Sequence, residues 1–291
     1  MPNRTSLLTA ISLCGALLSL PTAGQAAGSG VRDVQDWLYD QHRIEVNGFV
    51  EMRGGLRTDR ELDEKDASMG EARVQLDGNK LFDWGTLKLK GDLVADGVDE
   101  EVRGELRELN LLLTPLDNMD LKIGRQVLTW GTGDLLFIND LFPKDWGSFF
   151  IGRDDEYLKA PSDAIKASFF FDLANIDLVY MPVFNNSAYI DGSRLSYWNP
   201  MLGRNAGRDF VFDDQERNSF DEDDSVAVRV SKNVNGIEYA LYGYHGYWST
   251  PKGLDPVAMR LTYPGLAVYG ASLRSTMFGG ITNLEFGYYD S

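Results

Sequence analysis

Residues 44–57 alternate between two kinds of side chain at almost every step. One parity holds only apolar or small residues, namely Ile44, Val46, Gly48, Val50, Met52, Gly54 and Leu56. The other parity carries Glu45, Asn47, Glu51, Arg53 and Arg57, interrupted only by Phe49 and Gly55. Successive side chains of a strand point to opposite faces, so this stretch is a ribbon with one apolar and one charged face. A sheet of a soluble protein can show the same pattern. The choice between a soluble and a membrane protein therefore depends on whether the pattern recurs along the chain.

The alternation recurs downstream in short segments separated by turn residues. We expect further strands at residues 72–77 and 87–96, around 109–113, from 121 onward, and at 163–171, 176–184, 225–231, 237–248, 266–276 and 281–289. Tight turns such as Asn235-Gly236 alternate with long connections at 131–162, 185–224 and 249–265. About eleven strands result, or twelve if Pro264-Gly265 belongs to another. This predicts an all-β fold, an antiparallel transmembrane β-barrel or an incomplete portion of one.

The two ends of the chain carry different signals. Arg4, the apolar run at 7–20 and the small residues at 24–27 predict a signal peptide over residues 1–26. Residues 27–43 are expected to be a periplasmic segment with a short helix at 31–41, and residues 44–291 the barrel. The sequence stops just after Tyr288-Tyr289, as though a strand were leaving for a loop, which suggests that the barrel is truncated at the C-terminus.

The composition limits the kinds of partner that this chain is expected to bind. Formal charge is -16, which disfavours nucleic acid, whose phosphates need a basic surface. The only cysteine, Cys14, lies in the leader, so no disulfide or thiolate site is expected in the mature chain. Expected partners are outer-membrane lipid, lipopolysaccharide and small polar solutes, and the oligomeric state is left open.

The charged parity of the first strands should line an aqueous lumen. These lumen-facing candidates are Glu45, Glu51, Arg53, Glu71, Arg73, Lys88, Lys90, Asp92 and Lys122. Mutual pairing in a crowded interior explains each single residue as well as a solute pathway does. As a set they predict a hydrated bore.

The connection at 131–162 is too long for a tight turn and rich in apolar residues that need somewhere to pack. Folded into the barrel, it would bury them and narrow the pore; an extracellular cap is the alternative. The constriction candidates here and at the strand before it are Arg125, Asp134, Asp140, Lys144, Asp145, Arg153, Asp154 and Asp155.

Residues 124–146 read GRQVLTWGTGDLLFINDLFPKDW. This segment, with YGASLR from Tyr269 and EFGYYDS from Glu285, resembles porin-like outer-membrane barrels, in particular the alginate-export-like barrels and related uncharacterised families. The likeness covers about a fifth of the chain. It implies a passive or substrate-selective channel and does not establish alginate as the substrate.

Catalytic and cofactor signals are weak. His42 and His245 are the only histidines, and no motif places a serine beside either, so no catalytic residue is assigned and the chain is not expected to be an enzyme. The acidic run at 209–224 matches no calcium loop, and no metal or cofactor is expected. We therefore expect a porin-like channel for small polar or charged solutes. A polysaccharide-binding, export or structural barrel is the alternative, and a barrel hydrolase the third.

Overall fold

The computed structural model describes residues 28–58, 64–133, 135–217, 219–220, 222–277 and 279–291. The expected signal peptide and the constriction candidate Asp134 lie outside these residues. The described part of the chain begins with a helix, α1 (Gly28–His42), where a short helix was expected. Its Gln35 side chain donates to the Val46 carbonyl at 2.6 Å, so α1 lies beside the first strand.

An antiparallel sheet of 11 strands forms the body of the molecule, in the order β1-β2-β3-β4-β5-β6-β7-β11-β12-β15-β16. Its strands are β1 (Ile44–Leu56), β2 (Ala67–Phe82), β3 (Gly85–Asp96), β4 (Glu101–Leu116), β5 (Met119–Val127), β6 (Pro161–Phe170), β7 (Asn175–Met181), β11 (Ser225–Val234), β12 (Ile237–Tyr247), β15 (Gly265–Met277) and β16 (Gly280–Asp290). Within this sheet, each strand pairs with the strand that follows it in sequence, as in the wall of a barrel. The prediction of an all-β, antiparallel sheet of about eleven strands is confirmed.

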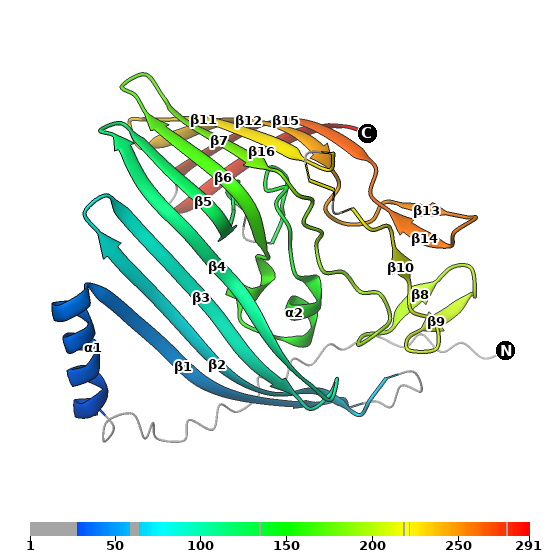
Figure 1. The fold of residues 1–291 in the computed structure, drawn as a ribbon. Coiled ribbons are helices and arrows are strands. Elements are labelled where there is room, and N and C mark those ends of the chain that lie inside the picture. Colours follow the sequence, from blue (N-terminus) through cyan, green and yellow to red (C-terminus); the bar gives the residue numbers. More distant parts are fainter. Residues whose placement is uncertain (1–27, 59–63, 134, 218, 221, 278) are drawn as a thin grey trace.

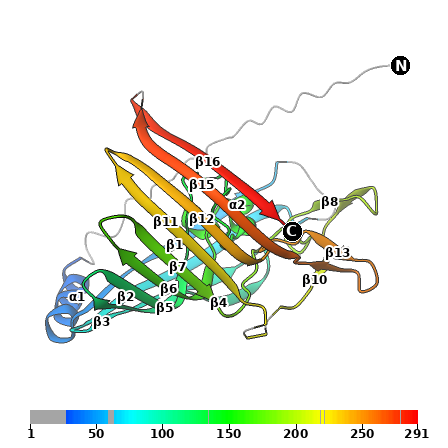
Figure 2. The ribbon, with the colours of Figure 1, turned by 90° about the horizontal axis from the view of Figure 1, so that it is seen from above.

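The sheet curves around α2 (Trp146–Ile151), with β1 and β16 as its two edges (Figures 1 and 2). Short turns join the strands at one end, for example at 117–118 and 235–236, and long connections leave from the other end (Figure 1). Asn235 and Gly236 both have positive φ, which makes their turn tight. No helix among the described residues is long and apolar enough to cross a bilayer.

Two long connections contain strands that the sequence pattern missed. The segment after β7 holds β8 (Tyr197–Asn199), β9 (Arg204–Ala206) and β10 (Asp213–Asp214), and the segment after β12 holds β13 (Gly253–Asp255) and β14 (Arg260–Thr262). These strands are two or three residues long. Alternation cannot be recognised over so few positions, so both regions were expected to be loops.

The two faces of the main sheet are reversed relative to a water-soluble protein. Val50 is 73% exposed and Leu89 49% exposed on the convex face, whereas Arg73 and Asp92 on the concave face are 2% and 5% exposed. The sheet therefore turns its apolar residues outward and its charged residues inward.

A bulge in β4 changes which residues face inward. Lys90 pairs with Glu108 and the next residue, Gly91, pairs with Leu106, so Arg107 is extra. Such a bulge lets consecutive residues share one face. Arg107 is buried and donates to the Glu156 carbonyl at 2.8 Å, and Glu108 lies 3.4 Å from Lys122, so both point into the concavity.

Gly124 in β5 is required by the pairing of β4 with β5. Its φ is +120°, and a Cβ there would come within 2.3 Å of the Leu109 carbonyl oxygen. We predict that Gly124→Ala lowers the free energy of unfolding by about 1–3 kcal/mol, because it adds backbone strain and forces the strands apart. Gly54→Ala is the matched control, since a Cβ at Gly54 meets nothing within 4 Å. Denaturant titration in detergent micelles measures both, and equal values for the two variants would contradict the prediction.

Candidate functional site

Residues 128–160, which we call the inner segment, leave the wall after β5 and return at β6. The segment contains α2 and the short 3-10 helix η2 (Asp155–Leu158). Asp145 caps α2, because its carboxylate accepts from the Ser148 amide at 2.8 Å, and Gly152 ends it in a left-handed conformation. The position of this segment within the curved sheet is what builds the site (Figure 1).

Glu285 of β16 holds the first part of the inner segment. Its carboxylate accepts five hydrogen bonds, from the amides of Thr132, Gly133 and Asn139, from the Thr132 hydroxyl and from the Asn139 side chain. The Thr132 hydroxyl lies 2.6 Å and the Asn139 side-chain nitrogen 3.2 Å from it. Charge-assisted bonds of this kind are about twice as strong as neutral ones. A single wall residue therefore fixes Thr132 and Gly133 on one side and Asn139 on the other.

Two glycines make room for this contact. Gly270 of β15 and Gly287 of β16 lie directly opposite each other in the sheet. A Cβ at Gly270 would come within 1.8 Å of the Asn139 side-chain oxygen, and one at Gly287 within 3.1 Å of Ile138. The YGASLR and EFGYYDS stretches thus have a physical reason for their glycines, which is the close approach of the inner segment.

The middle of the inner segment packs on the wall. Leu128 and Phe142 form a buried cluster with Ala164, Val179 and Ala227 from β6, β7 and β11, together with Met181. Next to it lies a buried ion pair, in which the Lys144 ammonium is 2.9 Å from Asp140. Burial lowers the pKa of Lys144, while the Asp140 carboxylate opposes that shift.

Tyr157 of η2 is the centre of the second contact with the wall. Its ring lies between the guanidinium groups of Arg73 and Arg107, at 4.1 and 4.6 Å from the ring centroid. Its hydroxyl accepts from Gln75 at 3.0 Å. The neighbouring Glu156 is 3.0 Å from Lys90 of β3. Burial acts to raise the pKa of Glu156, but hydrogen bonds from Lys90 and Gln75 outweigh it, so the pKa is lowered and the carboxylate stays charged.

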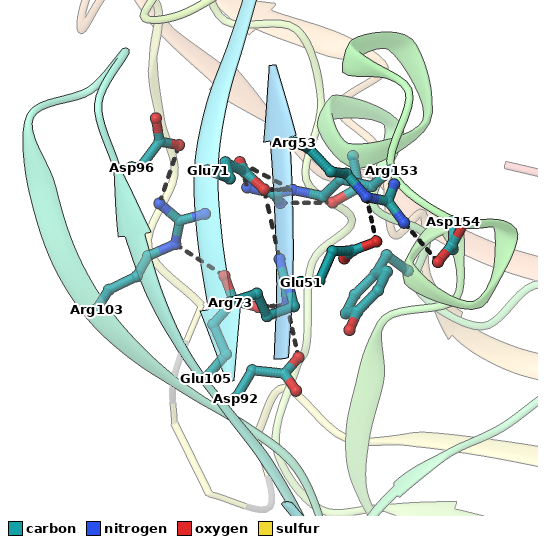
Figure 3. A network of polar contacts seen from close by, with 12 residues as sticks. Glu51, Arg53, Glu71, Arg73, Asp92, Asp96, Arg103, Glu105, Arg153 and Asp154 are labelled. Atoms are coloured by element: carbon teal, nitrogen blue, oxygen red, sulfur yellow. Dashed lines mark hydrogen bonds and ion pairs between the residues drawn. The ribbon is translucent and has the colours of Figure 1, made fainter. Parts of the chain in front are cut away.

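Ion pairs extend this contact to the first two strands (Figure 3). Asp154 of the inner segment lies 2.5 Å from Arg53, and Arg153 lies 2.5 Å from Glu71. The chain therefore crosses the concavity from β16 to β1–β4 and is bonded at both ends.

The wall itself carries a network of alternating charge around Arg73 (Figure 3). Arg73 is 2.6 Å from Asp92 and 3.3 Å from Glu105, and Glu105 in turn lies 2.8 Å from Arg103. Arg194, from the long connection after β7, reaches back to bond Asp96. Buried charges need partners of this kind, because an unpaired one costs several kcal/mol.

A cavity of about 620 Å³ remains between the inner segment and the wall. Charges of both signs line it: Lys90, Arg107 and Glu108 from the wall, and Asp155, Glu156 and Lys159 from the inner segment, with apolar Val127, Leu135, Phe149 and Leu158 between them. It is large enough for a small hydrated solute and offers that solute both donors and acceptors.

The constriction candidates fall into different places. Arg153 and Asp154 dock the inner segment, Asp155 lines the cavity, and Asp145 caps α2. Asp140 and Lys144 bond each other. Arg125 is set apart, because it pairs across the sheet with Leu109 and Asp163, on the register of the convex face.

The lumen-facing candidates lie mostly on the concave side and are mutually bonded. Glu51 pairs with Arg53 at 2.6 Å, Lys88 with Asp77 at 3.3 Å, and Lys122 with Glu108 at 3.4 Å. Glu71, Arg73, Asp92 and Lys90 belong to the contacts described above, whereas Glu45 is exposed near the short-turn end.

Several residues of the site were not singled out from the sequence, and four of them are central to it. Gln75 was noted only as part of an alternating strand, and the bulge hid the inward direction of Arg107. Glu285 could have been found, since it lies on the inward parity of its strand beside glycines. Tyr157 gave no signal, because nothing in its neighbours predicts a ring between two arginines.

The histidines are far apart in the fold. His245 pairs with Val226 and Ala267 on the convex register of the sheet, and His42 ends α1 beside Trp37. Ser272 lies on the concave side, 2.9 Å from the Tyr242 hydroxyl. Ser272 and His245 therefore face opposite sides of the wall.

Comparison with known proteins finds similar structures but no similar sequence. No family model matches the chain, and no curated protein sequence matches it. The structure is similar to that of OmpTdeltaL8, a deletion mutant lacking loop L8 of OmpT, an outer membrane protein of Vibrio cholerae. The TM-score is 0.44 and the identity 12%, over 84% of this chain and 69% of the other. At this level the likeness carries no argument about function.

The exclusion of an enzyme requires a correction. The expectation rested only on missing sequence motifs, and a missing motif does not exclude catalysis. One fold hosts many activities, so catalysis is decided by a site and not by the barrel. As an exclusion, the prediction is wrong.

We predict that Glu285→Gln releases the first part of the inner segment while the sheet remains folded. An amide presents donors where the carboxylate accepts five hydrogen bonds, so part of the bonding is lost and part becomes repulsive. Limited proteolysis and amide hydrogen exchange over residues 128–145 measure the release. Asp290→Asn, an exposed change in the same strand, is the control. Equal protection in the two variants would refute the role given to Glu285.

Proposed function

We propose that this chain is an outer-membrane barrel protein that lets small polar or charged solutes diffuse past its inner segment. The observation that carries the proposal is the reversed sheet: apolar residues such as Val50 and Leu89 cover the convex face, and a bonded charge network covers the concave face. Hydrocarbon outside and water inside is the environment that suits this distribution.

The site adds a constriction to this proposal. The inner segment occupies part of the concavity, and the cavity of about 620 Å³ beside it is the space through which a solute would pass. Opposed charges on the wall and on the segment would select permeants by sign. The resemblance of residues 124–146 to porin-like barrels supports the same function, and the alginate-export subfamily is one form that it would take.

The remaining expectations belong to the same proposal. Residues 1–26 would direct export, residues 27–43 would lie in the periplasm, and the long connections would meet lipopolysaccharide. Stepwise ion currents in a planar bilayer test the proposal directly. A folded barrel that conducts nothing would argue for the binding or structural alternative.

We predict that Asp155→Lys shifts ion selectivity toward anions and that Lys159→Glu shifts it toward cations. Both residues line the cavity, so their charge acts on a passing ion at short range and low dielectric. Reversal potentials under a salt gradient measure the shift. Asp117→Lys, in an exposed short turn, is the control. Unchanged reversal potentials in the two cavity variants would remove the constriction role.

We predict that Leu89→Lys destabilises the protein in lipid vesicles by about 2–4 kcal/mol, because it places a charge at mid-height on the hydrocarbon-facing side. Leu173→Lys is the control, since Leu173 is 86% exposed in the short turn between β6 and β7. The free energy of unfolding from vesicles measures both. If Leu89→Lys were tolerated as well as Leu173→Lys, the convex face would not be in a membrane.

A further inference from the structure

The wall has a gap beside β4. Pairing between β4 and β5 ends at Leu109 and Arg125, although β4 continues to Glu101. Residues 101–108 pair with β3 on one side, and no described strand pairs with them on the other. At roughly 3.3 Å per residue, this unpaired edge extends for about 25 Å. The inner segment, entering after β5, lies behind it.

Arg125 crosses the end of this gap. Its Nε donates to the Leu106 carbonyl of β4 at 2.8 Å, and a terminal nitrogen lies 2.9 Å from the Asp163 carboxylate of β6. Both charged residues share the convex register with Ile123 and Ile165, which are each 39% exposed. An ionisable pair on a hydrocarbon-facing surface is expensive, and such residues mark functional sites in membrane proteins.

A cleft of about 300 Å³ lies in the wall at this point. Gly104, Leu106, Arg125 and Pro161, which line it, lie on the convex register, whereas Glu105, Arg107 and Tyr157, which also line it, point into the concavity. Residues of both registers therefore border this cleft. Arg107 also lines the large cavity, so this residue borders both spaces.

We propose that this cleft is a lateral binding site for an amphiphile with a carboxylate head and an alkyl chain, which enters from the lipid side. The head would bind Arg125, whose guanidinium already holds one carboxylate, that of Asp163. Asp163 is 47% exposed in its side chain and would turn aside when the ligand arrives. The alkyl chain would lie on Leu106, Leu109 and Ile165, exposed apolar residues around the mouth.

The chemistry of the site favours this occupant over a free polar solute. A planar guanidinium binds a carboxylate with two parallel hydrogen bonds, and the interaction strengthens in surroundings of low dielectric. A polar solute without a chain would gain nothing from the apolar mouth. A neutral chain would leave the guanidinium without a new partner.

The full chain in lipid nanodiscs, probed with a doxyl-labelled stearate, tests the proposal by electron paramagnetic resonance. The measured quantity is the protein-immobilised fraction of the label, compared with that of its methyl ester. We expect the stearate to bind about tenfold more tightly than the ester, the gain of a hydrogen-bonded charge pair. Arg125→Gln should abolish this preference, and Asp163→Asn should strengthen stearate binding because a competing carboxylate is gone.

Two controls keep the result interpretable. The double variant R125Q/D163N removes both members of the ion pair, so neither is left without the other; it should fold even if Arg125→Gln alone does not, and it should also lack the preference. Arg43→Gln removes a cation at the short-turn end, beside Asp83, and should leave binding unchanged.

The same samples separate this proposal from the channel. Equal binding of stearate and ester, or a preference that survives in R125Q/D163N, would overturn the lateral site. Stearate binding in a barrel that conducts no ions would uphold the lateral site while the channel proposal fails.

Discussion

Every other feature of this structure depends on how its charged residues are accommodated on the concave side of the sheet. A strand with one apolar and one charged face can be folded either way round, and the choice is set by what surrounds it. Here Arg73, at 2% exposure, is surrounded by Asp92, Glu105 and Tyr157, so its charge is neutralised by bonding and not by bulk water. That arrangement leaves the apolar parity free to face outward.

The inner segment fills part of the concavity, and its charged residues also neutralise charged residues of the wall. Glu71 is bonded by Arg153, Arg53 by Asp154 and Lys90 by Glu156, each a wall residue paired with one from the segment. Removing Arg153, for example, would take the nearest cation from the Glu71 carboxylate, which is buried, and this is destabilising. The segment and the wall are therefore mutually dependent, and Glu285 fixes the far end by the same physics with backbone amides as the donors.

The sequence predicted the strands well and the site in part, for reasons that differ between residues. Alternation is a local property, so β1–β3 and their lumen-facing charges could be read directly. The bulge at Arg107 depends on how β4 meets β3, and the position of Arg125 depends on where the pairing of β4 with β5 ends. Both are set by non-local contacts that no single segment encodes. Tyr157 was unpredictable for the same reason, because its two arginines come from β2 and β4.

The bulge and the gap have one physical origin. After the last β4–β5 pair the chain of β5 must leave the wall to form the inner segment, so the edge of β4 beyond Leu109 loses its partner. In the membrane location proposed above, such an edge is unfavourable, because its amides and carbonyls lack hydrogen bonds. Arg125 satisfies one such carbonyl, that of Leu106, and Arg107 turns inward to bind the carbonyls of Glu156 and Lys159. Arg125, which a lateral ligand would bind, is thus also the residue that satisfies a backbone carbonyl at the unpaired edge of β4.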